Sequence, residues 1–466
     1  MSADLCFSPV TELASRLRSR KLSPVELTRR YLDRIRSLDP RLGAFVTVTA
    51  DQALQEASRA EVEIGAGRYR GELHGVPYAV KDLVATKGVR TTWGSRLFAD
   101  QIPDHDATVI ERLRAAGAVL LGKLSMNELG TGPPGADWNG PVRNPWKLDH
   151  WTHGSSTGPA AAVAGGLAAF AIASETTSSI LGPASACGIV GFRPTYGRVS
   201  RYGVMPLSWT MDKVGPMARR VADCATVFRA IHGADPRDPT SINAPFEFRP
   251  GKRPAGCRLG VVCEEFEQLR GPGADAPYRS ALDVLRGLDL ALEEIELPKF
   301  PYREVSSFIW QVESFSVFEP YARDGRLQRA LLNKDRWIGW KAAAATPASD
   351  YMKVLRIRHA IARAASELTV RCDVLVAPMN PLGARPIQPA MGGEPAGRPA
   401  LTDNLLRLGT LAGLPAVTVP CGFTPSGLPV GLAFVGRQTR DDIVCRIAHA
   451  FEQATEWRLL RPAFLE

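Results

Sequence analysis

The 466-residue sequence contains no hydrophobic run that is long enough to cross a membrane. The longest apolar run, Pro159 to Ala173, is rich in Ala and Gly and falls short of the roughly 20 residues that a membrane-spanning helix needs. We interpret it as a buried helix that leads into a strand. The opening residues, MSADLCFSPV, lack a basic stretch followed by an apolar one, so we expect no secretory signal and no membrane association.

Cysteine pairs with metal-binding spacing are also absent. None of the eight cysteines forms a CxxC pair, and the seven histidines include no HExxH motif. This pattern argues against a structural zinc site and against a catalytic metal, so we expect no metal and no cofactor. Scattered cysteines are typical of reduced thiols, which favours a cytoplasmic location.

A dense basic tract is missing as well, although the net charge is +9. The Arg and Lys residues are spread over stretches with helical character, such as Arg16 to Arg20 and Arg29 to Arg36. Because this favours a solvated basic surface over a nucleic-acid footprint, we expect no direct nucleic-acid binding. The chain is 45% hydrophobic and 23% charged, which permits a large buried core and indicates a globular enzyme.

The order of apolar runs and helical patterns predicts an α/β fold. In the middle third, helical patterns alternate with short apolar runs of strand length: Val76 to Val80, Ala118 to Leu121, Ala169 to Ala173 and Gly188 to Gly191. The same pattern of short apolar runs returns near the end of the sequence. There we expect strands at Ala416 to Pro420 and Gly431 to Val435 and a closing helix from Asp441 to Ala454. Residues 236–400 are less regular and richer in Pro and aromatic residues.

Two short motifs suggest chemistry but stand in the wrong context. Gly117 to Lys123 fits the front of a phosphate-binding loop, but Leu124 occupies the Ser/Thr position and the intervening residues are apolar. Gly154 to Gly158 contains G-x-S-x-G centred on Ser156, which is the pattern of an α/β-hydrolase nucleophile elbow. The polar segment before it is not the strand that such an elbow requires. A nucleotide site and an α/β-hydrolase are therefore disfavoured.

Two other segments indicate catalytic residues only when they are considered together. Ser174 to Ile180 is rich in hydroxyl groups, which alone indicates a strand-to-helix turn with capping side chains. Lys81 ends an apolar run, which alone indicates a charged strand end. In the order Lys81, Ser155-Ser156 and Ser179, these residues and their flanking sequence resemble the amidase signature family over almost the whole chain. The spacing from Ser155 to Ser179 matches that family's separation between bridging serine and nucleophile.

Several longer segments are similar to the family's sequences too. They are LHGVPYAVKDLVATKG (73–88), ERLRAAGAVLLGKLSMNEL (111–129), RNPW (143–146), the segment 187–219 and AGLPAVTVPCGFTPSGLPVGLAFVGR (412–437). The resemblance implies the amidase signature fold, in which helices surround a central mixed β-sheet. It implies one amidase domain over 1–466, with N-terminal helices (1–68), a catalytic signature core (69–235), a variable substrate-pocket region (236–400) and a C-terminal sheet and helix (401–466).

The resemblance also implies roles for individual residues. Ser179 attacks the carboxamide carbonyl, Ser155 relays its proton, and Lys81 in its neutral form is the base. Burial favours a neutral lysine because loss of hydration lowers the pKa of an ammonium group. Ser155 follows a cis peptide bond in the family, and Ser156 donates a supporting hydrogen bond. The backbone N–H groups around the nucleophile, contributed by Thr176, Thr177, Ser178 and Ser179, form the oxyanion hole.

Five residues depart from the family's pattern. Thr177 and Ser178 stand where two glycines commonly precede the nucleophile, and Leu181 replaces a common arginine. Glu175 stands in place of the usual Asp, and His153 in place of Gly. A Cβ at a glycine position can narrow a pocket or exclude a positive φ angle.

Three functions remain open. The leading hypothesis is hydrolysis of a small or aromatic carboxamide through an acyl-enzyme on Ser179. The second is acyl transfer to an amine or ammonia, as in an amide-forming acyltransferase or the A-type subunit of a tRNA-dependent amidotransferase. Asp403 matches the residue that binds the glutamine amine in such subunits, but no arginine matches the glutamine carboxylate. The third is an inactive member acting as a binding protein, which the joint presence of Lys81, Ser155 and Ser179 disfavours.

The expected partner is a small-molecule amide, and the sequence leaves a homodimer open. Met126, Trp209, Phe308 and Trp310 are candidates for the lining of an apolar substrate pocket, although buried aromatic residues more often belong to an ordinary core.

Overall fold

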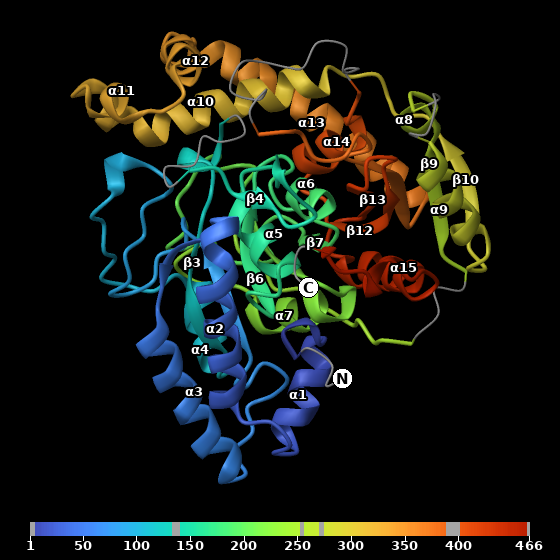
Figure 1. The fold of residues 1–466 in the computed structure, drawn as a ribbon. Helices are drawn as coiled ribbons and strands as arrows, with labels where there is room; N and C mark the ends of the chain where they lie inside the picture. Colours follow the sequence, from blue (N-terminus) through green and yellow to red (C-terminus); the bar gives the residue numbers. More distant parts are fainter. Residues whose placement is uncertain (1–4, 133–139, 252–255, 270–274, 388–400, 464–466) are drawn as a thin grey trace.

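The computed structural model describes residues 5–132, 140–251, 256–269, 275–387 and 401–463. Helices α1 (Val10–Arg18), α2 (Pro24–Leu42) and α3 (Ala50–Gly65) come first and lie at one end of the molecule in Figure 1. The Ser23 side chain caps α2 by accepting hydrogen bonds from two first-turn N–H groups, and Pro24 occupies the first helical position. Gly43, at φ +69°, ends the helix in the left-handed conformation.

One large mixed sheet runs through the described part of the chain. Its eleven strands follow the order β1-β3-β2-β6-β8-β7-β12-β13-β11-β9-β10. From one edge to the other their bounds are Phe45–Val48, Val119–Leu124, Pro77–Lys81, Phe170–Glu175, Lys213–Ala218, Val190–Arg193, Ala416–Phe423, Pro429–Gly436, Val374–Met379, Arg258–Val262 and Ala291–Ile295. Strands β2, β3 and β6 are parallel, whereas β8 runs antiparallel to β6 and β7. The expected α/β fold with a central mixed sheet is therefore confirmed.

The apolar runs of the sequence form the central strands. Every residue of β2, β3, β7 and β8 is buried, because helices cover both faces of the sheet. Helix α5 (Thr157–Ala164) is buried on all sides, as its Ala-rich composition predicts. Strand β6 follows it after a short turn, so residues 159–173 do form a buried helix and a strand.

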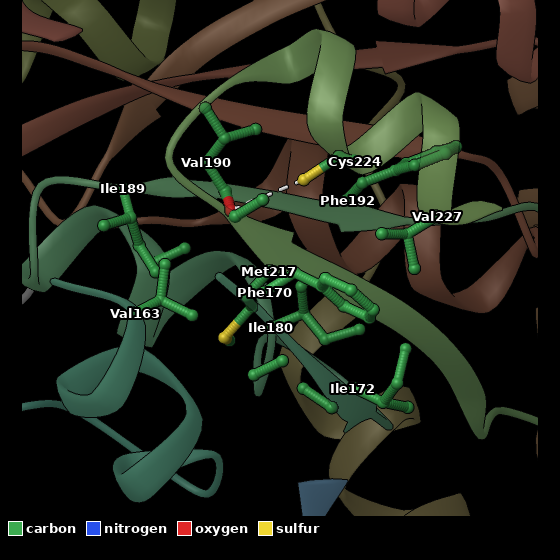
Figure 2. Close-up of a cluster of buried hydrophobic side chains, with 14 of the residues drawn as sticks. Val163, Phe170, Ile172, Ile180, Ile189, Val190, Phe192, Met217, Cys224 and Val227 are labelled. Carbon is green, nitrogen blue, oxygen red and sulfur yellow. Dashed lines mark hydrogen bonds between the residues drawn. The ribbon is translucent and has the colours of Figure 1, made fainter. Parts of the chain in front are cut away.

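A tightly packed apolar cluster fixes the end of β6. Figure 2 shows side chains of β6, β7, β8 and α7 (Val221–Ile231) in one group, including Phe170, Ile172, Met217, Phe192 and Val227. Ile180, which follows the hydroxyl-rich loop, is fully buried in the same cluster. The loop between Glu175 and Ile180 is therefore anchored in the core at both ends.

The remaining helices surround the sheet. They are α4 (Thr108–Ala115), α6 (Leu181–Ala186), α8 (Cys263–Glu267), α9 (Ala276–Arg286), α10 (Tyr302–Arg323), α11 (Arg326–Ala330), α12 (Lys334–Ala344), α13 (Ala348–Arg371), α14 (Asn404–Leu411) and α15 (Asp441–Gln453). Among the described helices, none is long and apolar enough to span a membrane. A separate two-stranded ribbon, β4 (Arg143–Asn144) and β5 (Lys147–Trp151), precedes α5.

The described residues of the segment 236–400 are more regular than the sequence pattern indicates. Its described residues include β9 to β11 and the two long helices α10 and α13, which lie at the opposite end of Figure 1 from α1 to α3. Helix α10 packs against α11, α12, α13 and α14. Its apolar residues are therefore spread around its circumference, and no single hydrophobic face reveals the helix in the sequence.

The pairing of β1 with β3 depends on Gly122, and substituting it tests this register. Gly122 adopts φ +152°, and an added Cβ would lie 2.1 Å from the backbone oxygen of Thr47. We expect Gly122→Ala to lower the free energy of unfolding by about 2 kcal/mol or more, because the two strands must separate locally. Gly65→Ala is the control, since an added Cβ there meets nothing within 4 Å. Equal melting temperatures for the two variants would contradict this packing.

Candidate active site

The candidate site lies where two neighbouring parallel strands end. Lys81 is the last residue of β2, and the hydroxyl-rich loop 176–179 follows β6 directly. Because β2 and β6 pair in parallel, with Val80 opposite Ile172, both segments leave the sheet at the same edge. The loop 152–156, which leads into α5, meets them there.

Lys81 is completely buried and is surrounded by hydroxyl groups. Its Nζ lies 2.8 Å from Ser155 Oγ and 3.1 Å from Ser174 Oγ, and it also donates to the Ser174 backbone oxygen at 3.4 Å. Burial lowers the pKa of Lys81 from its usual value to about 7, although the carboxylates of Asp212 and Glu175 oppose this effect. A substantial neutral fraction of Lys81 therefore exists near neutral pH.

Two adjacent serines approach the lysine from the loop before α5. The peptide bond between Gly154 and Ser155 is cis, as the family resemblance implies. An added Cβ on Gly154 would lie 1.7 Å from Asn127 Oδ1, so only glycine fits this position. Ser156 Oγ donates to the Ser174 backbone oxygen at 3.3 Å. Ser155 thus contacts the end of β2, and Ser156 contacts the end of β6.

Glu175 closes the loop that carries Ser179. One of its carboxylate oxygens accepts hydrogen bonds from the backbone N–H groups of Ile180 at 2.7 Å and Leu181 at 2.9 Å. The other accepts from the Arg193 guanidinium at 2.8 Å, and both side chains of this ion pair are fully buried. Thr410 Oγ1 accepts a hydrogen bond from Arg193 and donates one to the Thr177 backbone oxygen at 2.9 Å.

The other side of the loop is fixed by β8 and the residues before it. Thr176 Oγ1 donates to Asp212 Oδ1 at 2.6 Å, and the Thr176 backbone oxygen accepts from Lys213 Nζ at 3.2 Å. Burial lowers the pKa of Lys213 well below its usual value. The Asp212 carboxylate also accepts hydrogen bonds from the backbone N–H groups of Leu207 and Ser208.

These contacts use the carbonyl oxygens of the loop and leave its N–H groups available. Within the described residues, the backbone N–H groups of 176–179 donate no hydrogen bond to another part of the chain. Thr177 and Ser178 do not adopt positive φ angles, so the loop forms without the glycines that are common in the family. Residues 176–179 and Ser155 line one cavity of about 430 Å³. Such a set of free donors can bind an oxyanion.

His153 is one of the five residues that depart from the family's pattern. Its backbone keeps the left-handed conformation that favours glycine, since its φ is +65°. Its ring stacks on Trp151 with a centroid distance of 5.1 Å and faces Gly182, where an added Cβ would lie 2.8 Å from the ring. His153 lines the cavity that contains Ser179. It therefore forms a wall of the site that a glycine would leave open.

The predicted substrate-binding residues do not gather in one place. Met126 is 1% exposed and lines none of the described cavities, so it belongs to the core. Trp209 is 55% exposed, lies against the Arg201 guanidinium, and lines a second cavity of about 230 Å³, which shares Ser155 and Thr176 with the cavity of Ser179. Asp403 lines a third cavity of about 590 Å³. Of the aromatic candidates, Trp310 lines the cavity of Ser179.

Arg407 is a site residue that the sequence analysis missed. It lines both the cavity of Ser179 and that of Asp403, and its Nε donates to Asp403 Oδ1 at 2.6 Å. In the sequence, Asp403 stands four residues before Arg407. This spacing at the start of a helix indicates an ion pair between the two side chains. The described part of the chain holds no group of three or more His, Cys, Asp or Glu side chains that could bind a metal ion.

Comparison with known proteins identifies the family. The model of the amidase family matches residues 26–445, and the chain therefore belongs to the amidase signature family. It is 38% identical to the A-type subunit of the glutamyl-tRNA(Gln) amidotransferase of Moorella thermoacetica, over 98% of this chain and 99% of that protein.

Solved structures lead to the same family. The native peptide amidase of Stenotrophomonas maltophilia superposes with a TM-score of 0.84 at 31% identity, over 98% of both chains. The A-type subunit of the Thermotoga maritima glutamyl-tRNA(Gln) amidotransferase gives a TM-score of 0.78 at 30% identity, over 96% of this chain and 94% of that one. The family is one of enzymes that act on C–N amide bonds.

The buried ion pair of Glu175 and Arg193 is expected to determine the stability of the loop. Glu175→Gln keeps the side-chain shape but leaves the Arg193 charge buried without a counter-ion. We expect the free energy of unfolding to fall by about 3 kcal/mol or more. Glu319→Gln removes the exposed ion pair with Arg323 and should change it by less than about 1 kcal/mol. Equal denaturation midpoints for the two variants would show that the buried pair is unimportant.

Proposed function

We propose that this protein cleaves a carboxamide C–N bond through an acyl-enzyme on Ser179. The observation that carries the proposal is the contact between the buried Lys81 and Ser155 Oγ, because the low pKa of Lys81 makes it a proton acceptor near neutral pH. Ser155 and Ser179 line the same cavity, which supports a relay from one hydroxyl group to the other.

In the proposed reaction, neutral Lys81 takes the proton of Ser155 while Ser155 takes the proton of Ser179. The Ser179 oxygen attacks the amide carbonyl, and the resulting oxyanion lies against the free N–H groups of 176–179. As the C–N bond breaks, the leaving amine receives a proton back from Lys81 through Ser155. The acyl group remains on Ser179 as an ester until water or another nucleophile removes it.

The fate of the released nitrogen separates two functions. The peptide amidase neighbour supports hydrolysis by a stand-alone enzyme. The similarity to A-type amidotransferase subunits over nearly the full length of both chains favours the second function, in which the nitrogen passes to another substrate within a multi-subunit complex. Transfer agrees better with the names of these relatives. Hydrolysis and transfer share the first half-reaction, in which the acyl group passes to Ser179.

Purification distinguishes these two functions. If the tagged chain, isolated from the cells that produce it, carries a second protein in fixed ratio and hydrolyses amides only slowly when that protein is removed, transfer is supported. If the chain alone releases the amine from small or aromatic amides at an undiminished rate, hydrolysis is supported.

Covalent labelling tests the nucleophile. We expect a fluorophosphonate to react with Ser179, and peptide mapping should locate the adduct on that residue. Ser179→Ala should abolish labelling, whereas Ser156→Ala should retain it, since Ser156 only donates to a backbone oxygen. An adduct on Ser156 would support an α/β-hydrolase mechanism instead, and a chain that is never labelled would support an inactive binding protein.

The pH dependence of the reaction tests the base. Below the pKa of Lys81 the ammonium form cannot accept a proton, so kcat/KM should rise with pH up to about 7 and then level off. Lys81→Arg stays protonated at every usable pH and should lower kcat/KM by about 100-fold or more.

Lys353→Arg, on the exposed face of α13, is the control and should have no effect. If a correctly folded Lys81→Arg variant kept most of the wild-type kcat/KM, Lys81 would be a structural residue rather than the base.

A further inference from the structure

Two hydrogen-bond donors in the wall of the Ser179 cavity have no acceptor within the described residues. They are the indole Nε1 of Trp151 and the amide Nδ2 of Asn127. Both side chains line that cavity, and they are 7% and 1% exposed, respectively. Because a buried N–H group without an acceptor is costly, we expect an acceptor from outside the chain to bind at this wall.

The two donors lie beside each other, next to Gly154. A Cβ built on Gly154 would lie 1.7 Å from Asn127 Oδ1 and 2.9 Å from Trp151 Cζ2. The amide Nδ2 is bonded to the same carbon as Oδ1, and the indole Nε1 is two bonds away from Cζ2. Each donor is therefore close to the point where the two side chains meet. The next residue in the chain is Ser155, which relays the proton in the proposed reaction.

The backbone around the two donors holds them in place. The backbone N–H of Asn127 donates to the Ser155 carbonyl oxygen at 3.2 Å. The backbone N–H of Trp151 donates to the Arg385 carbonyl oxygen at 2.7 Å, and the indole ring stacks on His153. The side chains of Trp151 and Asn127 carry no charge. Fixed neutral N–H groups suit a neutral carbonyl oxygen, whose two lone pairs can accept from both donors.

We propose that the substrate of Ser179 carries a second, neutral carbonyl oxygen that accepts hydrogen bonds from Trp151 Nε1 and Asn127 Nδ2. The proposal rests on the proposed function of Ser179 and specifies its substrate class, an amide with a further ketone or amide carbonyl near the scissile bond. This second point of attachment restricts the rotation of the substrate while its scissile carbonyl lies against the N–H groups of 176–179. The second carbonyl can belong to the acyl part or to the amine part of the amide.

Binding to the Ser179→Ala protein tests the proposal without relying on catalysis. Each comparison uses a pair of neutral amides that differ in one carbonyl oxygen. The pairs are acetoacetamide with butyramide and levulinamide with valeramide for the acyl part, and N-acetonylacetamide with N-propylacetamide for the amine part. In one pair the carbonyl member should bind about fivefold more tightly or better in isothermal titration calorimetry, because two buried donors gain an acceptor.

Substitutions of the two donors assign the preference to this wall. Trp151→Phe and Asn127→Leu each remove one donor, and each should lower the ratio of the two affinities. Trp146→Phe is the matched control, since the indole Nε1 of Trp146 already donates to the Cys187 carbonyl oxygen at 2.8 Å. This control should leave the ratio unchanged.

The indole N–H signal of Trp151 gives a second measurement, with both donors in place. In NMR spectra of the Ser179→Ala protein, where Trp151→Phe assigns this signal, the preferred carbonyl ligand should move it downfield and the alkyl counterpart should not. The proposal is overturned if no carbonyl ligand is preferred, if the preference persists in both donor variants, or if the preferred ligand leaves this signal in place.

Fluorophosphonate labelling of Ser179 in the unsubstituted protein is measured separately. Loss of that labelling while the carbonyl preference is intact would refute the proposed catalysis and leave the carbonyl site standing.

Discussion

Removal of the Lys81 ammonium group from water is the constraint on which the site depends. A lysine at a strand end normally extends into solvent, but β2 lies inside the sheet and the loop before α5 covers its end. Hydroxyl groups and a backbone oxygen surround Nζ, and no carboxylate of the described residues contacts it directly. The neutral amine is therefore stabilised relative to the ammonium ion, which is what a proton acceptor requires.

The ionic network behind the nucleophile loop joins distant parts of the chain. Glu175 at the end of β6 binds Arg193 of β7, and Arg193 binds Thr410 of α14. The same helix carries Arg407 at the far side of the cavity. The N–H groups of 176–179 and the Arg407 side chain are thus positioned by one connected structure. This arrangement holds the N–H groups of the loop and the wall formed by Arg407 of α14 in a fixed mutual geometry.

The sequence predicts the parts of the fold in which local pattern and tertiary environment agree. The apolar runs become buried central strands, and the buried helix and strand of 159–173 are evident from composition. Helix α10 escapes prediction because it packs on several neighbours and shows no single apolar face. The pairing of Lys81 with Ser155 is recognisable only through the family resemblance, since 74 residues separate the two. Arg407 becomes a site residue only when α10 and α14 pack together.

The neutral fraction of Lys81 near physiological pH can be measured directly. Lysine labelled with ¹³C at Cε gives an NMR signal whose chemical shift follows the protonation of Nζ, and Lys81→Met assigns the signal of Lys81. We expect this signal to titrate with a pKa of about 7 in the folded protein. A signal that titrates near the ordinary lysine pKa of about 10.4 would contradict the role of Lys81 as the base, because Lys81 would then be an ammonium ion during catalysis.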